Sequence, residues 1–258
     1  MSLLKPASES SARCFFGIYG PQGAGKSRTA TELAIATRAA LNLTGPILAV
    51  DTERGFKFQA PRILQETGQE LLLLETREVK TLIEGLKEAK ETNVSVCIVD
   101  SITHFLRELR NEWMKKNKRT SMDVGDYQEA DKPFKKLLDG MVRSASNLII
   151  CGRQGSVYGL KQNTRGKWTN GPIDTKMAAG EAGYEVDLLL ELKQKIVPGK
   201  TVDDAKIVRQ AFVEKDRSDT IKGTCLTVPW DAAEVMAPFF AFLNAGKPET
   251  SSAQKGGE

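Results

Sequence analysis

Short apolar runs alternate with segments of helical period along most of the chain. Each run has the length of a strand and is apolar almost throughout, which is typical of strands buried on both faces of a sheet. The runs are CFFGIY from Cys14, PILAV from Pro46, ELLLLE from Glu70, VSVCIVD from Val94 and NLIICG from Asn147. Because strands that alternate with helices join through right-handed crossovers, this pattern predicts an α/β fold with a mainly parallel sheet flanked by helices.

Three other segments carry apolar residues at helical spacing, which predicts amphipathic helices. The stripes are Val79, Leu82, Ile83 and Leu86; Leu106, Leu109 and Trp113; and Tyr127, Ala130, Phe134, Leu137 and Met141. Pro133 falls inside the third stripe, where a proline predicts a kink or a late helix start.

The pattern changes after residue 152. A stretch that runs to about residue 180 has no clear period and contains many Gly, Lys and Arg residues, so we expect a mobile loop there. Three strand-like segments then follow without helices between them: EVDLLLEL from Glu185, KIVRQAFVE from Lys206 and GTCLTVP from Gly223. Consecutive strands separated by turns predict an antiparallel C-terminal extension of the sheet.

The ends of the chain differ from its middle. Residues 1–12 and 247–258 are polar and read as flexible tails. Between them, an amphipathic helix at about 231–244 follows the last strand, and no break in composition marks a boundary. We therefore expect one domain over residues 13–246.

Composition narrows the class of protein. The chain has 258 residues, 40% hydrophobic and 27% charged, which excludes a disordered protein, and no apolar run is long enough to cross a membrane. The formal net charge of +4 is too small to establish a nucleic-acid partner. Cys97 and Cys151 lie in apolar runs, and the single histidine, His104, argues against a zinc site and reads as a packing residue. These features predict a reduced, cytoplasmic protein with no membrane partner.

Residues 20–27 read GPQGAGKS, a complete phosphate-binding loop (P-loop) between a predicted strand and a predicted helix. Its glycines allow the backbone to approach a phosphate, and the N–H groups at the helix start surround that phosphate with positive partial charge. The motif predicts ATP binding, with Lys26 on the β- and γ-oxygens. The expected ATP-binding residues are Gly20, Pro21, Gln22, Gly23, Ala24, Gly25, Lys26, Ser27 and Arg28.

The run VSVCIVD ends in Asp100. Ligands of open α/β sheets collect at the carboxyl ends of the strands, so this aspartate is expected beside the P-loop. Hydroxyl and carboxylate oxygens suit Mg²⁺, and the sequence therefore predicts Ser27 and Asp100 as its ligands.

The strand PILAV is followed by Asp51-Thr52-Glu53. With the P-loop before it and Asp100-Ser101 after it, this segment resembles the core of the RecA/RadA recombinases, over residues 13 to about 228. The resemblance implies a RecA-like P-loop ATPase fold with Glu53 as the carboxylate that polarises the attacking water and Lys26 as its partner in catalysis. If Glu53 is not that group, Glu181 and Glu185 are the next candidates.

Two further segments are similar to motifs of that family. NLIICGRQG looks like its sensor strand, which implies Arg153 or Gln154 as the residue that touches the γ-phosphate. FVEKDRSD looks like the strand whose two basic residues reach ATP on a neighbouring subunit, which implies Lys215 and Arg217 as trans-acting fingers in a filament or ring. The chain looks most like the small RecA-like ATPases of phages and prophages, which are linked to single-strand annealing and recombination in the bacterial cytoplasm.

Basic residues cluster where the family keeps its DNA-binding loops. Residues 153–176 carry five basic side chains against one acid, with aromatic residues interleaved, and a second cluster follows the helix after Asp100. Mobile basic groups for phosphates and aromatic faces for bases are typical of single-strand binding. The expected DNA-binding residues are Lys115, Lys116, Lys118, Arg119, Tyr158, Lys161, Arg165, Lys167 and Trp168.

These features predict an ATPase stimulated by single-stranded DNA, with a single-strand-binding protein as a further candidate partner. Two alternatives stay open from the sequence. A P-loop small-molecule kinase would use the basic stretch 153–176 as a lid, although Glu53 argues against it because a kinase must exclude water. A nucleotide-gated assembly factor would bind ATP and hydrolyse it slowly.

Overall fold

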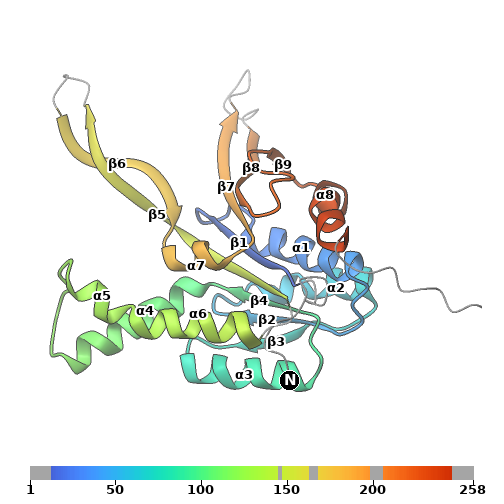
Figure 1. The fold of residues 1–258 in the computed structure, drawn as a ribbon, viewed down its shortest axis with the longest axis horizontal. Helices are drawn as coiled ribbons and strands as arrows, with labels where there is room; N and C mark the ends of the chain where they lie inside the picture. The colour runs from blue at the N-terminus through green and yellow to red at the C-terminus, as the bar shows by residue number, and fades with distance from the viewer. Residues whose placement is uncertain (1–12, 145–146, 163–167, 198–205, 246–258) are drawn as a thin grey trace, which may run out of the picture.

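A mixed sheet of nine strands forms the centre of the protein (Figure 1). The computed structural model describes residues 13–144, 147–162, 168–197 and 206–245; the predicted tails lie outside this range. The strands are β1 Phe15–Gly20, β2 Ile47–Asp51, β3 Leu72–Glu75, β4 Val96–Asp100, β5 Leu148–Gln162, β6 Trp168–Met177, β7 Leu188–Val197, β8 Lys206–Asp216 and β9 Cys225–Val228. The order is β3-β2-β4-β5-β1-β7-β8-β9, with β6 paired to β5 alone.

Six neighbouring strands pair in parallel, in the order β3, β2, β4, β5, β1 and β7. The next two strands, β8 and β9, pair antiparallel. The prediction of a mainly parallel sheet with an antiparallel C-terminal extension is thus confirmed. The first of the three C-terminal strands, β7, pairs in parallel with β1, so the antiparallel part begins one strand later than expected.

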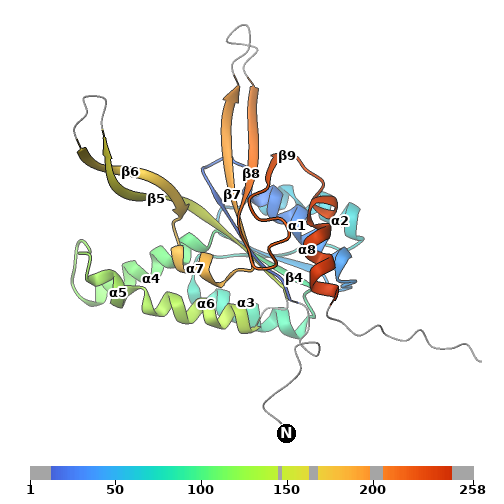
Figure 2. The same ribbon diagram turned by 45° about the horizontal axis from the view of Figure 1, so that its top comes forward.

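Helices cover both faces of the sheet (Figures 1 and 2). They are α1 Lys26–Ala40, the 3-10 turn η2 Phe56–Phe58, α2 Ala60–Thr67, α3 Val79–Glu91, α4 Ile102–Lys116, α5 Asp126–Ala130, α6 Lys132–Ser144, α7 Gly180–Glu185 and α8 Ala232–Ala245. Side chains alternate along each central strand, so that Ile47, Ala49 and Ile98 pack with α1 and α8, and Leu48 and Val99 pack with α3, α4 and α6. Burial on both faces explains why these strands are apolar throughout.

Two predictions about these elements were wrong, and one of the two alternatives at Pro133, the late helix start, was confirmed. β3 was expected to be buried, but it lies at the edge of the sheet, and Leu72 and Leu73 are 38% and 40% exposed. In the helical stripes, Ile83 and Tyr127 are exposed, each by 41%, because the helices bury a narrower face than the stripes suggested. The third stripe spans two helices, since α5 ends at Ala130 and α6 begins one residue before Pro133, as a late start requires.

The stretch from 153 to 180 was expected to be a loop and is instead an antiparallel ribbon. β5 continues past β1 to Gln162, and its outer part pairs with β6. The pairs run from Gln154 with Met177 to Gln162 with Trp168, and the register shifts at Val157/Tyr158. The sequence lacks strand alternation here because neither face of the ribbon is covered by a helix layer. A second ribbon, the outer half of β7 and β8, rises from the same edge (Figure 2).

None of the helices in the part of the chain that the structure describes is long and apolar enough to cross a membrane.

Candidate active site

The P-loop connects β1 to α1 at the carboxyl edge of the sheet. Gly25 caps the first turn of α1 with a φ of 97°, a left-handed value that favours glycine. A Cβ on Gly20 would lie 2.5 Å from the carbonyl oxygen of Leu192, so this position also requires glycine. The loop therefore approaches its neighbours closely and presents the N–H groups at the start of α1 to the cavity in front of it.

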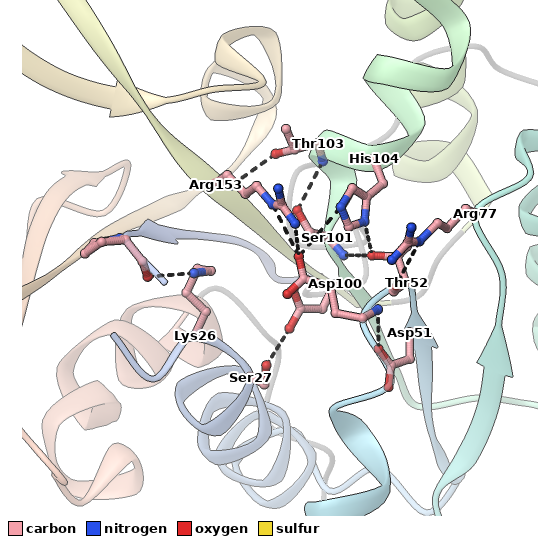
Figure 3. Close-up of polar contacts among 12 residues, drawn as sticks. Lys26, Ser27, Asp51, Thr52, Arg77, Asp100, Ser101, Thr103, His104 and Arg153 are labelled. Atoms are coloured by element: carbon pink, nitrogen blue, oxygen red, sulfur yellow. Dashed lines mark hydrogen bonds and ion pairs between the residues drawn. The ribbon is translucent and has the colours of Figure 1, made fainter. Parts of the chain in front are cut away.

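Lys26 points back over the P-loop. Its ammonium group donates to the carbonyl oxygens of Gly20, at 3.1 Å, and Pro21, at 2.9 Å (Figure 3). Neither acceptor carries a full charge, so the lysine keeps its positive charge available for an anion. A phosphate in the loop is the ligand that this arrangement suits best.

Ser27 and Asp100 meet as the sequence predicts. The Ser27 hydroxyl donates to Asp100 Oδ2 at 2.6 Å, across the boundary between α1 and β4 (Figure 3). Asp100 is 4% exposed, and its other oxygen, Oδ1, is buried without a hydrogen-bond partner among the described residues. Burial raises the pKa of Asp100 to about 6, although the Ser27 hydroxyl lowers it in part.

An unpartnered carboxylate oxygen beside a hydroxyl fits a divalent cation. Ser27 and Asp100 would hold Mg²⁺ directly or through water, and the ion would neutralise charge on the phosphate oxygens. The buried Oδ1 of Asp100 is the observation in favour of this assignment.

The turn after β2 presents Glu53. Asp51, 2% exposed, accepts the backbone N–H of Glu53 at 2.9 Å and that of Phe56 at 2.8 Å. Two backbone hydrogen bonds to one buried carboxylate fix the turn, and the side chain of Glu53 then extends toward the P-loop. Glu53 and Asp100 line the same cavity of about 720 Å³ as the P-loop residues.

Arg153, the last residue of β5 that pairs with β1, contacts Glu53. The guanidinium group donates to Glu53 Oε1 from Nη2 at 2.9 Å and from Nε at 3.3 Å. Burial alone would raise the pKa of Glu53, but the hydrogen bond and charge of Arg153 outweigh it, and the net pKa is lowered. The carboxylate is therefore ionised at neutral pH. Arg153 and Gln154, the two sensor candidates, both line the cavity.

His104 was expected to pack without a chemical role; the structure adds polar contacts to this prediction and does not test the absence of a chemical role. Its Nδ1 lies 2.5 Å from the hydroxyl of Thr52, which also accepts the backbone N–H of Ser101 at 2.8 Å (Figure 3). Its Nε2 lies 3.8 Å from Glu53 Oε1. The signal in the sequence was its position, one helical turn after the strand that carries Asp100, at the edge where ligands collect.

Two other residues at the P-loop were missed. Phe58 lines the cavity and is 73% exposed, which is unusual for a large apolar side chain. Arg209 on β8 donates from Nε to the carbonyl oxygen of Gly23 at 3.1 Å. No feature of the sequence indicates that Arg209 contacts Gly23, because this contact depends on how β8 lies beside the P-loop.

The predicted DNA-binding residues whose side chains the structure describes lie at two places outside the cavity. Lys115 and Lys116 end α4, and Lys118 and Arg119 follow it; Arg119 lies 3.7 Å from Asp123 and 3.6 Å from Asp126. Tyr158 is 67% exposed on the ribbon of β5 and β6. Arg165 and Lys167 lie outside the described residues, as do the side chains of Lys161 and Trp168.

Lys215 and Arg217 contact their own chain away from the cavity. Lys215 donates to the carbonyl oxygens of Gly183 and Tyr184, and Arg217 donates to Tyr184 and pairs with Asp187 at 3.0 Å. Both therefore bind the segment around α7. Their predicted role on a neighbouring subunit stays a prediction.

Glu181 and Glu185, the alternative catalytic carboxylates, belong to α7 and do not line the cavity. Glu181 pairs with Lys135 at 3.1 Å. The geometry therefore favours Glu53.

Comparison with known proteins agrees with this geometry. A family model described as an AAA domain matches residues 13–221, which include the P-loop, Glu53, Asp100 and Arg153. The comparison with curated proteins gives no match. Because the family match covers most of the chain and the P-loop cavity lies within it, the chain belongs to the AAA-domain family of P-loop nucleotide-binding ATPases.

Proposed function

We propose that this protein hydrolyses ATP with Glu53 as the water-orienting carboxylate, and that it acts on single-stranded DNA in recombination or annealing of the phage RecA-like type. One observation supports this most strongly. The carboxylate of Glu53 lies in the same cavity as the P-loop and the pair Ser27–Asp100, on a turn fixed by buried Asp51.

Different residues around the cavity would bind the phosphates, orient the attacking water and contact the γ-phosphate. The P-loop N–H groups and Lys26 would bind the β- and γ-phosphates, which hold the terminal phosphoryl group in place. Glu53 would orient the attacking water and accept its proton, which typically accelerates a reaction by 10²–10⁴-fold. Gln154 or Arg153, where β5 leaves β1 and begins to pair with β6, would contact the γ-phosphate.

The proposed DNA partner rests on charge and shape. Two β-ribbons rise from the carboxyl edge, and the sequence of the ribbon of β5 and β6 carries a surplus of basic residues (Figure 2). Tyr158, exposed on this ribbon, offers an aromatic face for a base. Assembly into a filament or ring, through Lys215 and Arg217, is part of the same proposal, as is a location in the bacterial cytoplasm.

The test is ATP hydrolysis by the purified protein with Mg²⁺, with and without single-stranded DNA. We expect a low rate that single-stranded DNA raises, and no hydrolysis by Lys26→Ala. Lys87→Ala, which removes an exposed lysine from α3, is the matched control and should behave like the wild type. A rate that DNA leaves unchanged would contradict the DNA partner, and hydrolysis by Lys26→Ala would contradict the assignment of the site.

A further inference from the structure

The ribbon formed by the outer halves of β7 and β8, residues 193–197 and 206–210, begins beside β1, the strand that leads into the P-loop (Figure 2). β7 follows the loop closely. At the start of the loop, the carbonyl oxygen of Leu192 lies 2.5 Å from the position that a Cβ on Gly20 would occupy. Further along, Gln194 Nε2 lies 3.3 Å from the corresponding position on Gly23. The ribbon therefore packs against the loop at more than one point.

Arg209 on β8 adds a hydrogen bond to this packing. Its Nε donates to the carbonyl oxygen of Gly23 at 3.1 Å. Arg209 and Gln194 are cross-strand partners, so their side chains lie on the same face of the ribbon. Two residues further in on that face, Leu192 and Ala211 are fully buried in the core. The packed base of the ribbon therefore fixes where Arg209 meets the loop.

Arg209 reaches the loop from outside the nucleotide cavity. The P-loop lines that cavity from Gly20 to Arg28, whereas Arg209 is not among the described residues that line it. The loop thus separates the guanidinium group from the place where phosphates would bind. Any effect of Arg209 on a nucleotide must therefore act through the loop.

The contact sets the direction of one peptide group. In a planar trans peptide the C=O and the N–H point in opposite directions. Because Arg209 holds the carbonyl oxygen of Gly23 toward the ribbon, the N–H of Ala24 points to the inner side of the loop. There it lies 3.3 Å from the carbonyl oxygen of Pro21, a long hydrogen bond that a phosphate oxygen can replace. Inward N–H groups of this kind form the anion-binding concavity of a P-loop.

The charge of Arg209 strengthens this effect. The outer halves of β7 and β8 contain no acidic residue, and within the part of the chain that the structure describes Arg209 has no ion-pair partner. A hydrogen bond from a charged donor is stronger than one from a neutral donor. It also polarises the peptide that accepts it, which makes the N–H of Ala24 a better donor.

We propose that Arg209 is a positioning residue for nucleotide binding, which holds the peptide between Gly23 and Ala24 in the orientation that receives a phosphate and so couples the β7–β8 ribbon to the nucleotide. This inference rests on the proposed function only for ATP in the P-loop, and it requires neither DNA nor hydrolysis. Because coupling between two sites is reciprocal, a bound nucleotide should in turn hold the ribbon in place.

The first experiment measures the dissociation constants of ATP and ADP with Mg²⁺ by calorimetry. Arg209→Ala should bind both about tenfold more weakly, the loss expected for one hydrogen bond from a charged donor. Arg209→Lys keeps a charged donor and should recover part of this loss. Lys195→Ala, which removes an exposed lysine from the same ribbon, is the matched control and should bind like the wild type.

Two further measurements separate positioning from a structural role. The unfolding temperature without nucleotide should be the same in Arg209→Ala and the wild type. In hydrolysis, the KM for ATP should rise in Arg209→Ala while kcat stays unchanged, since the loop binds the ground state and the transition state alike. A lower unfolding temperature in Arg209→Ala would assign its weaker binding to a folding defect and overturn the proposal.

Hydrogen exchange of the backbone amides in residues 193–197 and 206–210 tests the coupling. Saturating ATP should slow this exchange in the wild type and in Lys195→Ala, and should leave it unchanged in Arg209→Ala. Normal ATP affinity in Arg209→Ala, or an equal loss in Lys195→Ala, would overturn the positioning role. ATP binding without any change in exchange in the wild type would overturn the coupling. If the wild type does not bind ATP at all, the proposed function itself fails.

Discussion

Arg153 holds the carboxylate of Glu53 through two hydrogen bonds to one oxygen, with Nη2 2.9 Å from Oε1. The two residues are 100 positions apart in the chain: Glu53 lies in the turn after β2, and Arg153 lies on β5. The bond ties the residue that would activate water to the base of the β5–β6 ribbon. It also keeps Glu53 ionised, which a base requires.

Replacing the carboxylate tests its role. Glu53→Gln should bind ATP and hydrolyse it at least about a hundredfold more slowly, because an amide cannot accept the proton of the attacking water. Turnover and nucleotide binding should be measured separately. Glu88→Gln, an exposed position on α3, is the control for the same chemical change. A Glu53→Gln protein with normal turnover would show that another group activates the water.

The β5–β6 ribbon can be tested by charge removal. Changing Lys161, Arg165 and Lys167 together to alanine should weaken single-strand binding and reduce the salt slope by about two, at ~0.7 for each lost phosphate contact. Trp168→Ala should cost about 1–3 kcal/mol if a base stacks on the indole. The control triple, Lys80, Lys87 and Lys90 to alanine on α3, removes the same charge elsewhere. Equal loss in both triples would mean that overall charge, and not the ribbon, attracts DNA.

Mixing two inactive proteins tests whether Lys215 and Arg217 act on ATP bound by a neighbouring subunit. Glu53→Gln keeps Lys215 and Arg217, and the double variant Lys215→Ala/Arg217→Ala keeps Glu53. If the basic pair acts on a neighbouring subunit, a mixture on single-stranded DNA should hydrolyse ATP although neither protein does so alone, since trans-acting fingers accelerate hydrolysis by about 10³–10⁵. An inactive mixture, with co-assembly confirmed, would assign Lys215 and Arg217 only to their contacts with the α7 segment.

His104 makes stability depend on pH. Burial and the arginine charges lower its pKa below 6.5 in the folded protein. Below about pH 6.5 the unfolded chain therefore binds a proton that the folded protein does not, and stability falls as pH decreases through this window. We expect the unfolding temperature of the wild type to fall relative to that of His104→Asn between pH 7.5 and 5.5, because the opposite contribution of Asp100, whose pKa burial raises to about 6, is common to both proteins. Equal drops in the two proteins would indicate that other groups cause the effect.

Much of this fold could be predicted because its strands are buried on both faces. A run such as VSVCIVD has the length and the apolar character of a strand buried on both faces, and the P-loop motif identifies the strand and helix that begin the nucleotide site. The register then brings Asp100 beside Asp51, and Gly20 beside Arg153. Ser27 meets Asp100 for the same reason.

The features that were missed depend on contacts between distant segments. The outer part of β5 has no apolar pattern, because its partner is β6 and no helix covers it. The role of His104 depends on Thr52 and Ser101, which only the pairing of β2 with β4 brings within reach. Arg209 reaches Gly23 because β8 lies next to β7, which lies next to β1. Local sequence does not encode such contacts.

The position of β1 has a consequence for the synthesis of the protein. The P-loop is translated before β5 and β7, yet β1 lies between these two strands, and the N–H of Phe15 is bound by Asp187, 172 positions later. Contacts at such separation form slowly, since a long loop must close first. A nascent chain that ends before β7 would carry the whole GPQGAGKS motif on a strand with one side unpaired. ATP affinity should therefore arise only after β7 has been translated and has paired with β1.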